Sequence, residues 1–502
     1  MDVVFRRADL AQRPVGAIVV GILKGERKPT GAAAAVDRAS GGAITELLSR
    51  RDFEGKSADV AVLYPRRIKA RRLIVVGLGP RAELTPHRAR LAAAAGVRRA
   101  RELRAGTVAT VALGAGRGRL DPVAAAQATA EGAVLGPWRF TAYRSKPGTP
   151  ALRRVEIVES DGAKAAVLAA AVERGTRWAE GVVLARDLAW MPGDDLTPER
   201  LAERAKEVAR GAEARIEVLD VPAMERLGMN CILGVGRGSV HPPRFVVLER
   251  GPRPRAGRVP PTVVVVGKGV TFDSGGISLK PREKMHEMKY DMSGAAAVLG
   301  LFAALPGADL PCRVVGLIPT AENMPGGRAL KPGDVLRAMD GTSIEITNTD
   351  AEGRLLLADA LVYAKRYEGA TVLDLATLTG AICIALGTAA AGLFTSDDRL
   401  AGELIAAGET AGERLWRMPL WEEYERDLES DTADVVNAAA SRDGGACNAA
   451  KFLQRFPAGM RWAHIDMAGT GWAERDQPHE RKGPTGFGVR LLLEWLTRHA
   501  AG

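Results

Sequence analysis

The sequence predicts two α/β domains, a smaller N-terminal domain and a larger C-terminal domain with a mixed, mostly parallel sheet flanked by helices. Short β-branched apolar runs alternate with helix-like runs along nearly the whole chain, which is typical of βαβ units. A length of 502 residues exceeds what one hydrophobic core usually supports. The charge is also divided unevenly, because residues 1–150 hold 27 Lys or Arg against 12 Asp or Glu, whereas the remainder holds 43 against 48.

The N-terminal domain is predicted over residues 1–160. Its strands are expected at 17–23, 60–64, 73–76 and 107–113, and its helices at 87–103 and 123–134. A long helical run at 163–188 predicts a linking helix within 161–195.

The larger C-terminal domain is predicted over residues 196–502. Thr197, Pro198 and Glu199 mark its first helix, since they supply a hydroxyl cap, a proline in the first turn and an acid. Its strands are expected at 216–219, 245–248, 262–266, 313–318, 343–346, 371–375 and 463–467. Loops at strand ends are where α/β sheets place their functional groups, and the polar motifs of this domain lie there.

Composition excludes several classes of protein. No apolar stretch approaches the roughly 18 residues of a membrane-spanning helix, and the charged first thirty residues do not resemble a secretory signal. The four cysteines are isolated and form no C-x-x-C pair, which argues against a disulfide framework and a thiolate zinc site. We therefore expect a cytoplasmic protein without a membrane partner.

A glycine-rich loop follows the predicted strand 262–266. The loop, residues 267–280, carries Lys268, Asp273 and Lys280, and its spacing is not that of a phosphate-binding P-loop. Farther along, Asp291 stands just before an apolar helical run. Taken singly, these residues are better explained by a turn with a solvated Lys–Asp pair and by a helix-capping aspartate than by a functional site.

A third motif, residues 348–355, follows the strand predicted at 343–346. Asp350 and Glu352 lie two residues apart, so they point the same way in extended backbone. Thr349 and Glu352 also fit a capping box, which is the structural alternative. Two acids beside apolar segments are costly unless something positive neutralises them.

Together the three motifs favour a metal site. They gather four carboxylates in one domain with three cations, namely Asp273, Asp291, Asp350 and Glu352 with Lys268, Lys280 and Arg354. Hard oxygen donors suit divalent cations, and four carboxylates suit two ions that share ligands. Histidine contributes little, because His286 is expected at the surface or in a pocket and His464 in the core.

The string Asn-Thr-Asp-Ala-Glu-Gly-Arg-Leu at 348–355 resembles the signature of the leucine (cytosol) aminopeptidase family of dinuclear metallopeptidases. Residues 267–280 and 288–294 match the family's other metal-site motifs in order and spacing. The resemblance covers about residues 180–495 and is weaker over 1–160.

The resemblance implies a ligand set for two Mn²⁺ or Zn²⁺ ions. One ion would be held by Asp273, Asp350 and Glu352, and the other by Lys268, Asp273, Asp291 and Glu352, so that Asp273 and Glu352 bridge. Lys268 would bind as a neutral amine, because two adjacent cations depress its pKa.

The same resemblance implies a reaction and a specificity. A metal-activated water would attack the first peptide bond of a peptide with a free N-terminus. Lys280 would stabilise the oxyanion, and Arg354 would hold a bicarbonate that relays the proton. Met288, Thr377 and Gly380 would line a pocket for leucine or another bulky apolar residue. A homohexamer is also implied.

Two other functions stay open at this point. The strand 73–76 is followed by Gly77, Gly79 and Ala82, which loosely fits a dinucleotide fingerprint and would indicate an NAD-dependent oxidoreductase, although Pro80 removes a backbone donor. Separately, the net charge of +15 over 1–150 could attract nucleic acid, although compositional drift is the favoured explanation because the charges lack interleaved aromatics.

Overall fold

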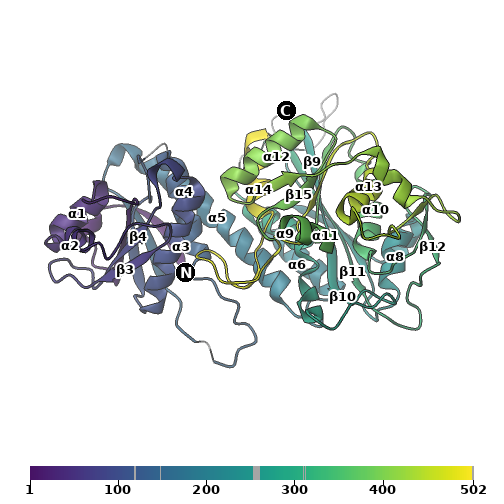
Figure 1. Cartoon of the computed structure of the whole chain (residues 1–502), viewed down its shortest axis with the longest axis horizontal. Helices are drawn as coiled ribbons and strands as arrows, with labels where there is room; N and C mark the ends of the chain where they lie inside the picture. Colours follow the sequence, from purple (N-terminus) through teal and green to yellow (C-terminus); the bar gives the residue numbers. More distant parts are fainter. Residues whose placement is uncertain (118–119, 147, 253–259, 309, 311, 500–502) are drawn as a thin grey trace. The chain divides into compact units, whose positions relative to one another are not determined.

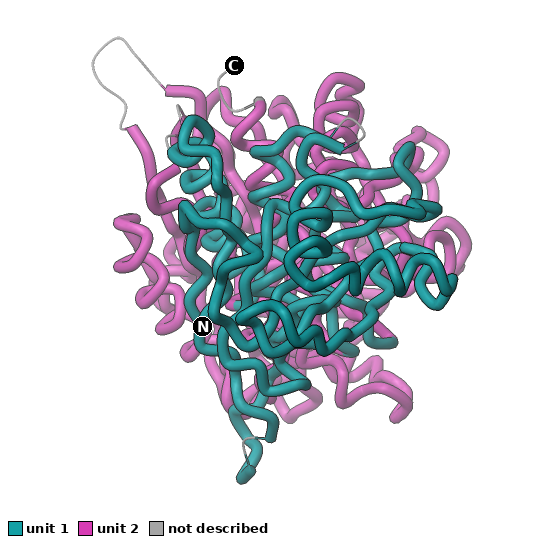
Figure 2. The backbone as a smooth tube through the Cα atoms, turned by 90° about the vertical axis from the view of Figure 1, so that its left-hand side faces the viewer, with its two compact units in different colours: residues 1–183, 475–482 teal, residues 184–474, 483–502 magenta. Residues whose placement is uncertain are grey.

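The computed structural model confirms the predicted α/β fold. It has two large sheets, and helices pack against each of them (Figure 1). It describes residues 1–117, 120–146, 148–252, 260–308, 310 and 312–499. The chain forms two compact units, residues 1–183 with 475–482 and residues 184–474 with 483–502 (Figure 2). Helix α5, Ala165–Trp190, contains the boundary between them. In the described ranges no helix has the length and apolar character needed to cross a membrane.

The first unit has a six-stranded sheet in which only β3 runs antiparallel to its neighbour. In sheet order the strands are β1 (Asp2–Arg7), β6 (Arg154–Glu159), β5 (Thr107–Thr110), β2 (Ala17–Ile22), β4 (Leu73–Gly77) and β3 (Val60–Leu63). Sequence patterns missed β1 and β6 because charged residues interrupt them. The structure explains the interruption, since buried Glu156 of β6 lies 2.7 Å from Arg13 and 3.1 Å from Arg6.

The helices of the first unit begin at recognisable caps. Thr85 accepts a hydrogen bond from the Arg88 amide at the start of α3, and Asp121 caps α4 in the same way. The unit contains α1 (Gly31–Ser40), α2 (Ala43–Ser49), α3 (Pro86–Glu102) and α4 (Pro122–Leu135). Helices α3 and α4 pack on each other, and α3 packs on β4.

The dinucleotide fingerprint after β4 is wrong as a structural prediction. A phosphate-binding loop leads directly from a strand into the N-terminus of a helix. Here Gly77 ends β4, a 3₁₀ turn occupies Arg81–Glu83, and α3 begins only at Pro86. The glycine pair therefore does not open a helix, and the NAD-dependent oxidoreductase loses its structural basis.

The second unit has a nine-stranded mixed sheet whose centre is parallel. In order the strands are β16 (Leu415–Arg417), β15 (Ala391–Phe394), β18 (Arg461–Asp466), β14 (Thr371–Ala376), β9 (Thr262–Gly267), β11 (Arg313–Asn323), β8 (Arg244–Arg250) and β7 (Arg215–Leu219), with β10 (Gly269–Asp273) paired to β11. Because β18, β14 and β9 are mutually parallel, their carboxyl ends lie at one edge of the sheet.

Two groups of helices contact this sheet. Helix α9 (Ser293–Ala304) packs on β9, β11 and β14 and contacts α6 (Pro198–Gly211) and α14 (Val489–His499). Helix α10 (Glu352–Ala364) packs on β9 and β11 and contacts α8 (Asn230–Gly236) and α13 (Gly445–Gln454). The smaller elements are α7 (Val221–Arg226), α11 (Gly380–Leu386), α12 (Asp398–Ala411), β12 (Val335–Arg337), β13 (Ser343–Glu345), β17 (Val435–Val436), β19 (Trp472–Ala473) and β20 (Gly483–Pro484).

Adjacent strands β14 and β18 bury an acid–base pair in the sheet. Asp374 and His464 are register partners with no exposed surface, and Asp374 Oδ1 lies 2.5 Å from His464 Nδ1. The other Asp374 oxygen accepts a hydrogen bond from Trp462 Nε1 at 2.7 Å. His464 is thus a core histidine, as expected. Burial acts to lower its pKa, but the Asp374 carboxylate outweighs burial and raises the pKa above 6.5.

This pair predicts a pH-dependent contribution to stability. A histidine whose folded pKa is raised stabilises the fold fully below its unfolded pKa, and the contribution disappears as pH rises through the folded value. We expect the difference in unfolding free energy between the wild type and His464→Gln to be largest at acidic pH and to shrink as pH rises. Urea unfolding of both proteins over a pH series measures it. A difference that grows with pH would contradict the pairing.

Candidate metal centre

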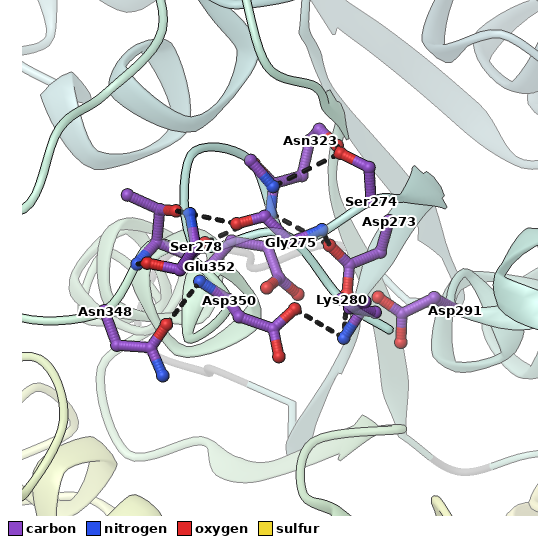
Figure 3. Close-up of polar contacts among 12 residues, drawn as sticks. Asp273, Ser274, Gly275, Ser278, Lys280, Asp291, Asn323, Asn348, Asp350 and Glu352 are labelled. Carbon is purple, nitrogen blue, oxygen red and sulfur yellow. Dashed lines mark hydrogen bonds and ion pairs between the residues drawn. The ribbon is translucent and has the colours of Figure 1, made fainter. Parts of the chain in front are cut away.

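The predicted ligands come together at the carboxyl edge of the parallel strands. Lys268 directly follows β9, and Asp273 ends β10. Asp291 directly precedes Met292, the N-cap residue of α9. Asp350 and Glu352 lie at the start of α10, and Glu352 is its first residue. Figure 3 shows the side chains of Asp273, Asp350, Glu352 and Asp291 gathered around Lys280.

The structural alternatives for these acids are wrong. Helix α9 has Met292 at its N-cap without a side-chain cap, so Asp291 is not a cap. Helix α10 has Ala351 at its N-cap, and Thr349 does not form a capping box with Glu352. The Thr349 hydroxyl instead donates to the Gly275 carbonyl at 2.6 Å and joins the two loops that carry the acids.

Carboxylate oxygens are crowded in this cluster. One oxygen from each of Asp273, Asp350 and Glu352 lies within 4.8 Å of the other two. Asp291 is linked to them through Lys268, whose Nζ lies 2.8 Å from Asp291 and 2.9 Å from Glu352 Oε1. The second Glu352 oxygen is buried and has no hydrogen-bond partner among the residues that the structure describes. A buried, unpaired oxygen beside three other acids fits a site for cations.

The charges in the cluster shift one another's pKa values. Burial raises the pKa of Asp291 well above its usual value, and burial with neighbouring acids raises the pKa of Asp350 to about 6. Burial and Glu352 also raise the pKa of Asp273. Burial acts to raise the pKa of Glu352 as well, but the two lysines outweigh it and lower the value. Burial acts to lower the pKa of Lys268, whereas the surrounding carboxylates raise it.

Lys280 contacts the acids on the other side of the cluster. Its Nζ lies 2.7 Å from Asp273 Oδ2 and 2.6 Å from Asp350 Oδ1, and the side chain retains about a fifth of its exposure. Its pKa is raised by Asp273 and Glu352 against the effect of burial. Lys280 therefore stays protonated and can donate hydrogen bonds to a negatively charged oxygen.

Two glycines let the backbones approach closely enough to form the cluster. A Cβ on Gly294 would lie 2.1 Å from the Leu375 carbonyl oxygen and 2.7 Å from the Lys268 nitrogen, so α9 could not start there. A Cβ on Gly353 would lie 2.5 Å from Lys268 Cε and 2.7 Å from Nζ. Because Gly353 has no side chain, it leaves the space that the Lys268 amine occupies. Gly294 in the same way lets the start of α9 approach the backbone of Leu375 and Lys268.

All ten residues predicted for the site line one cavity of about 600 Å³. Met288, Thr377 and Gly380 form part of its wall, beside the five proposed ligands and Lys280. Arg354 also reaches it. Its Nη1 donates to the Asn437 carbonyl at 2.7 Å, and its Nε is buried without a hydrogen-bond partner. Burial lowers the pKa of Arg354 to about 10, which still leaves it charged near neutral pH.

The hydrogen bonds that Asn323 and Thr377 make to the cluster were not predicted from the sequence. Asn323, at the end of β11, donates to Asp273 Oδ1 at 2.9 Å and to the Thr349 carbonyl at 3.1 Å. The Thr377 hydroxyl donates to Asp291 at 2.6 Å, and its carbonyl accepts from Lys268 Nζ at 3.0 Å. These contacts join residues many positions apart, so no local spacing could signal them.

Family comparisons agree with this geometry. A model of the cytosol aminopeptidase family's catalytic domain matches residues 183–493, and a model of the same family's N-terminal domain matches 19–147. The chain belongs to the cytosol aminopeptidase family. The family assigns it the activity of a metal-dependent aminopeptidase, and three acids of the cluster lie close enough together to hold a metal ion.

Individual relatives cover nearly the whole enzyme. It is 44% identical to a probable cytosol aminopeptidase of Geobacter sp. strain M21 over 96% of each chain, and 47% identical to one of Roseiflexus castenholzii over 90% of this chain and 92% of that one. Among solved structures, the bottromycin maturation enzyme BotP in complex with Mn is 41% identical, with a TM-score of 0.85 over 97% of this chain and all of BotP. A tomato leucine aminopeptidase mutant is 32% identical, with a TM-score of 0.88 over 99% and 97%.

Gly353 gives a direct test of the packing around Lys268. We expect Gly353→Ala to weaken Mn²⁺ binding by roughly 10- to 100-fold, because the new methyl group displaces the Lys268 amine. Calorimetric titration of the metal-stripped protein measures the affinity. Gly402→Ala is the matched control, since Gly402 lies in α12 with nothing within 4 Å of its Cβ position. Equal Mn²⁺ affinities of the two variants would contradict the close approach.

Proposed function

We propose that the acid cluster of this aminopeptidase holds two divalent ions, Mn²⁺ or Zn²⁺. Asp273, Asp350 and Glu352 would hold one ion. Lys268, Asp273, Asp291 and Glu352 would hold the other. The observation that carries the proposal is the convergence of three carboxylate oxygens within 4.8 Å, next to a fourth buried acid. Oxygen-rich sites of this kind suit hard cations, and shared carboxylates suit a pair of them.

The ions, when bound, would supply a hydroxide near neutral pH and polarise the carbonyl of the first peptide bond. Lys280 lies at the edge of the cluster and keeps some exposure to the cavity. We propose that its ammonium group donates a hydrogen bond to the oxyanion that forms on the attacked carbonyl. For Lys268 to bind as an amine, it must lose the proton that the surrounding carboxylates stabilise, and nearby cations favour that loss.

Arg354 is proposed to hold an anion rather than to act as a base. A guanidinium that stays charged cannot accept a proton at neutral pH. Its buried Nε has no hydrogen-bond partner, and the side chain lines the cavity. A bicarbonate at this position would satisfy that donor and could carry the proton between water and the leaving amine.

We propose that the side chain of the substrate's first residue lies against the wall formed by Met288, Thr377 and Gly380. No atom lies within 4 Å of the Cβ position of Gly380, so the start of α11 leaves open space. The wall is apolar or small, which favours leucine and other bulky apolar N-terminal residues. The substrate would be a peptide with a free N-terminus.

The role of Lys280 can be separated from metal binding. We expect Lys280→Met to lower kcat on a leucine anilide by about 10²- to 10³-fold, because the oxyanion loses its donor. Bound metal per chain, measured by elemental analysis of the same sample, should stay at the wild-type level. A loss of metal in proportion to the loss of turnover would show that Lys280 maintains the site instead.

The assembly, location and domain roles are also proposals. We propose a homohexamer in the cytoplasm, on the basis of the family and of relatives named cytosol aminopeptidases. Residues 1–160 would form an N-terminal domain, 161–195 a linking helix, and 196–502 the catalytic domain.

Nucleic-acid binding by the basic N-terminal part is a second proposal. The connection between β3 and β4 carries Arg66, Arg67, Lys69 and Arg71, all exposed, next to Tyr64 with 66% of its surface exposed. Clustered cations beside an exposed aromatic ring suit a phosphate backbone and a stacked base. We expect the full chain to shift a DNA fragment in a salt-dependent way, and Arg66→Gln with Arg67→Gln to weaken the shift. Arg204→Gln, on helix α6, serves as the control, and an equal effect there would refute the assignment.

A further inference from the structure

Asp466 is a buried acid that the proposed reaction does not use. It is the last residue of β18, has no exposed surface and lies on the strand beside β14. Its carboxylate accepts hydrogen bonds from the Leu378 amide at 3.1 Å, the Thr379 hydroxyl at 2.7 Å and the Ala468 amide at 3.2 Å. All three donors are neutral. A carboxylate buried among neutral hydrogen-bond donors costs stability.

The partners of Asp466 belong to a short loop that also contacts the proposed metal ligands. This β14–α11 loop, residues 377–379, joins the end of β14 to the first residue of α11. At its start, the Thr377 carbonyl accepts from Lys268 Nζ at 3.0 Å and the Thr377 hydroxyl donates to Asp291 Oδ1 at 2.6 Å. Its other two residues, Leu378 and Thr379, donate to Asp466. One loop thus connects two ligands to one buried acid.

The Thr379 hydroxyl has a fixed direction in this arrangement. Its oxygen accepts from the Ile382 amide at 3.2 Å and so caps α11, which leaves its single proton for Asp466. An ionised carboxylate is an acceptor only, so it holds both the Leu378 amide and this hydroxyl. The loop is therefore fixed at two successive residues immediately after Thr377.

We propose that Asp466 is a positioning residue for the metal centre, and that it acts through the β14–α11 loop on Lys268 and Asp291. This role rests on the ligand set proposed above. An amine ligand has one lone pair, and the Thr377 carbonyl that accepts an N–H bond fixes where that lone pair points. The Thr377 hydroxyl likewise holds one Asp291 oxygen and leaves the other for a cation. Partners behind the ligands in this way set metal affinity and ligand orientation.

Asp374 provides a matched control for a substitution at Asp466. Both carboxylates are wholly buried, and they lie on adjacent strands of the same sheet. Asp374, however, bonds to Trp462 and His464, which are outside the β14–α11 loop. Asp374→Asn therefore removes one buried carboxylate charge from the same sheet, as Asp466→Asn does. It leaves the hydrogen bonds of Thr377, Leu378 and Thr379 in place.

The test is a calorimetric Mn²⁺ titration of the metal-stripped full chain. We expect Asp466→Asn to weaken one of the two binding events by roughly 10- to 100-fold, the range usual for partners of metal ligands. Asp374→Asn should bind Mn²⁺ as the wild type does, whatever its melting temperature. Wild-type affinity in Asp466→Asn would overturn the proposal. Equal weakening in both variants would also overturn it, because it would indicate general loosening of the sheet.

Thr379 supplies a second pair of variants in case Asp466→Asn does not fold. Thr379→Ser keeps the hydroxyl and should retain wild-type Mn²⁺ affinity, whereas Thr379→Val removes it and should weaken binding. Equal affinities of these two variants would refute the proposal.

Glu352→Gln separates this proposal from the ligand set itself. If Glu352→Gln leaves Mn²⁺ binding unchanged, the ligand set is wrong. If it weakens binding while Asp466→Asn and Thr379→Val do not, only the positioning role is wrong.

Discussion

The crowding of four carboxylates, three of them buried, against two lysines is the constraint on which the catalytic unit depends. Asp273, Asp291 and Glu352 have almost no exposed surface, and Lys268 is equally buried between two of them. Like charges at such distances oppose folding unless cations or protons balance them. In the proposed site, divalent ions would satisfy the excess oxygen atoms, so the same crowding that costs stability would create the site.

The fold meets this constraint with parallel strands and close backbone contacts. Strands β9 and β14 end at the same edge, and Lys268 N donates to the Leu375 carbonyl at 3.0 Å there. Glycines at 294 and 353 remove the atoms that would keep α9 and α10 away from Lys268. Buried apolar residues make up most of α9 and much of α10, the helices that carry these glycines. The acids are brought together by this packing and by the hydrogen bonds of Thr349, Asn323 and Thr377.

Sequence patterns predicted most of the sheet and the cluster of acids, whereas the family resemblance alone implied Lys268 as a ligand and the pocket residues Met288, Thr377 and Gly380. Continuous β-branched runs such as Val263–Val266 can only be buried strands, and the acids stand beside such runs. Sequence patterns failed to predict strands whose charged residues are buried in ion pairs, as in β6. They also failed to predict contacts between residues of neighbouring strands. Asp291 looked like a helix cap because its true partner, Lys268, lies 23 residues away. Asp466 and the contacts of Thr377 with the proposed ligands gave no signal in the sequence, because the partners lie on other strands or loops, far along the chain.

The positions of the bound ions test most directly whether two ions share the acid cluster. Crystals of the enzyme grown with Mn²⁺ and measured at the manganese absorption edge would show each ion as an anomalous difference peak. We expect two peaks about 3.5–4 Å apart, with Asp273 and Glu352 oxygens between them. A single peak, or manganese bound only outside the cluster of Lys268, Asp273, Asp291, Asp350 and Glu352, would contradict a shared two-ion site.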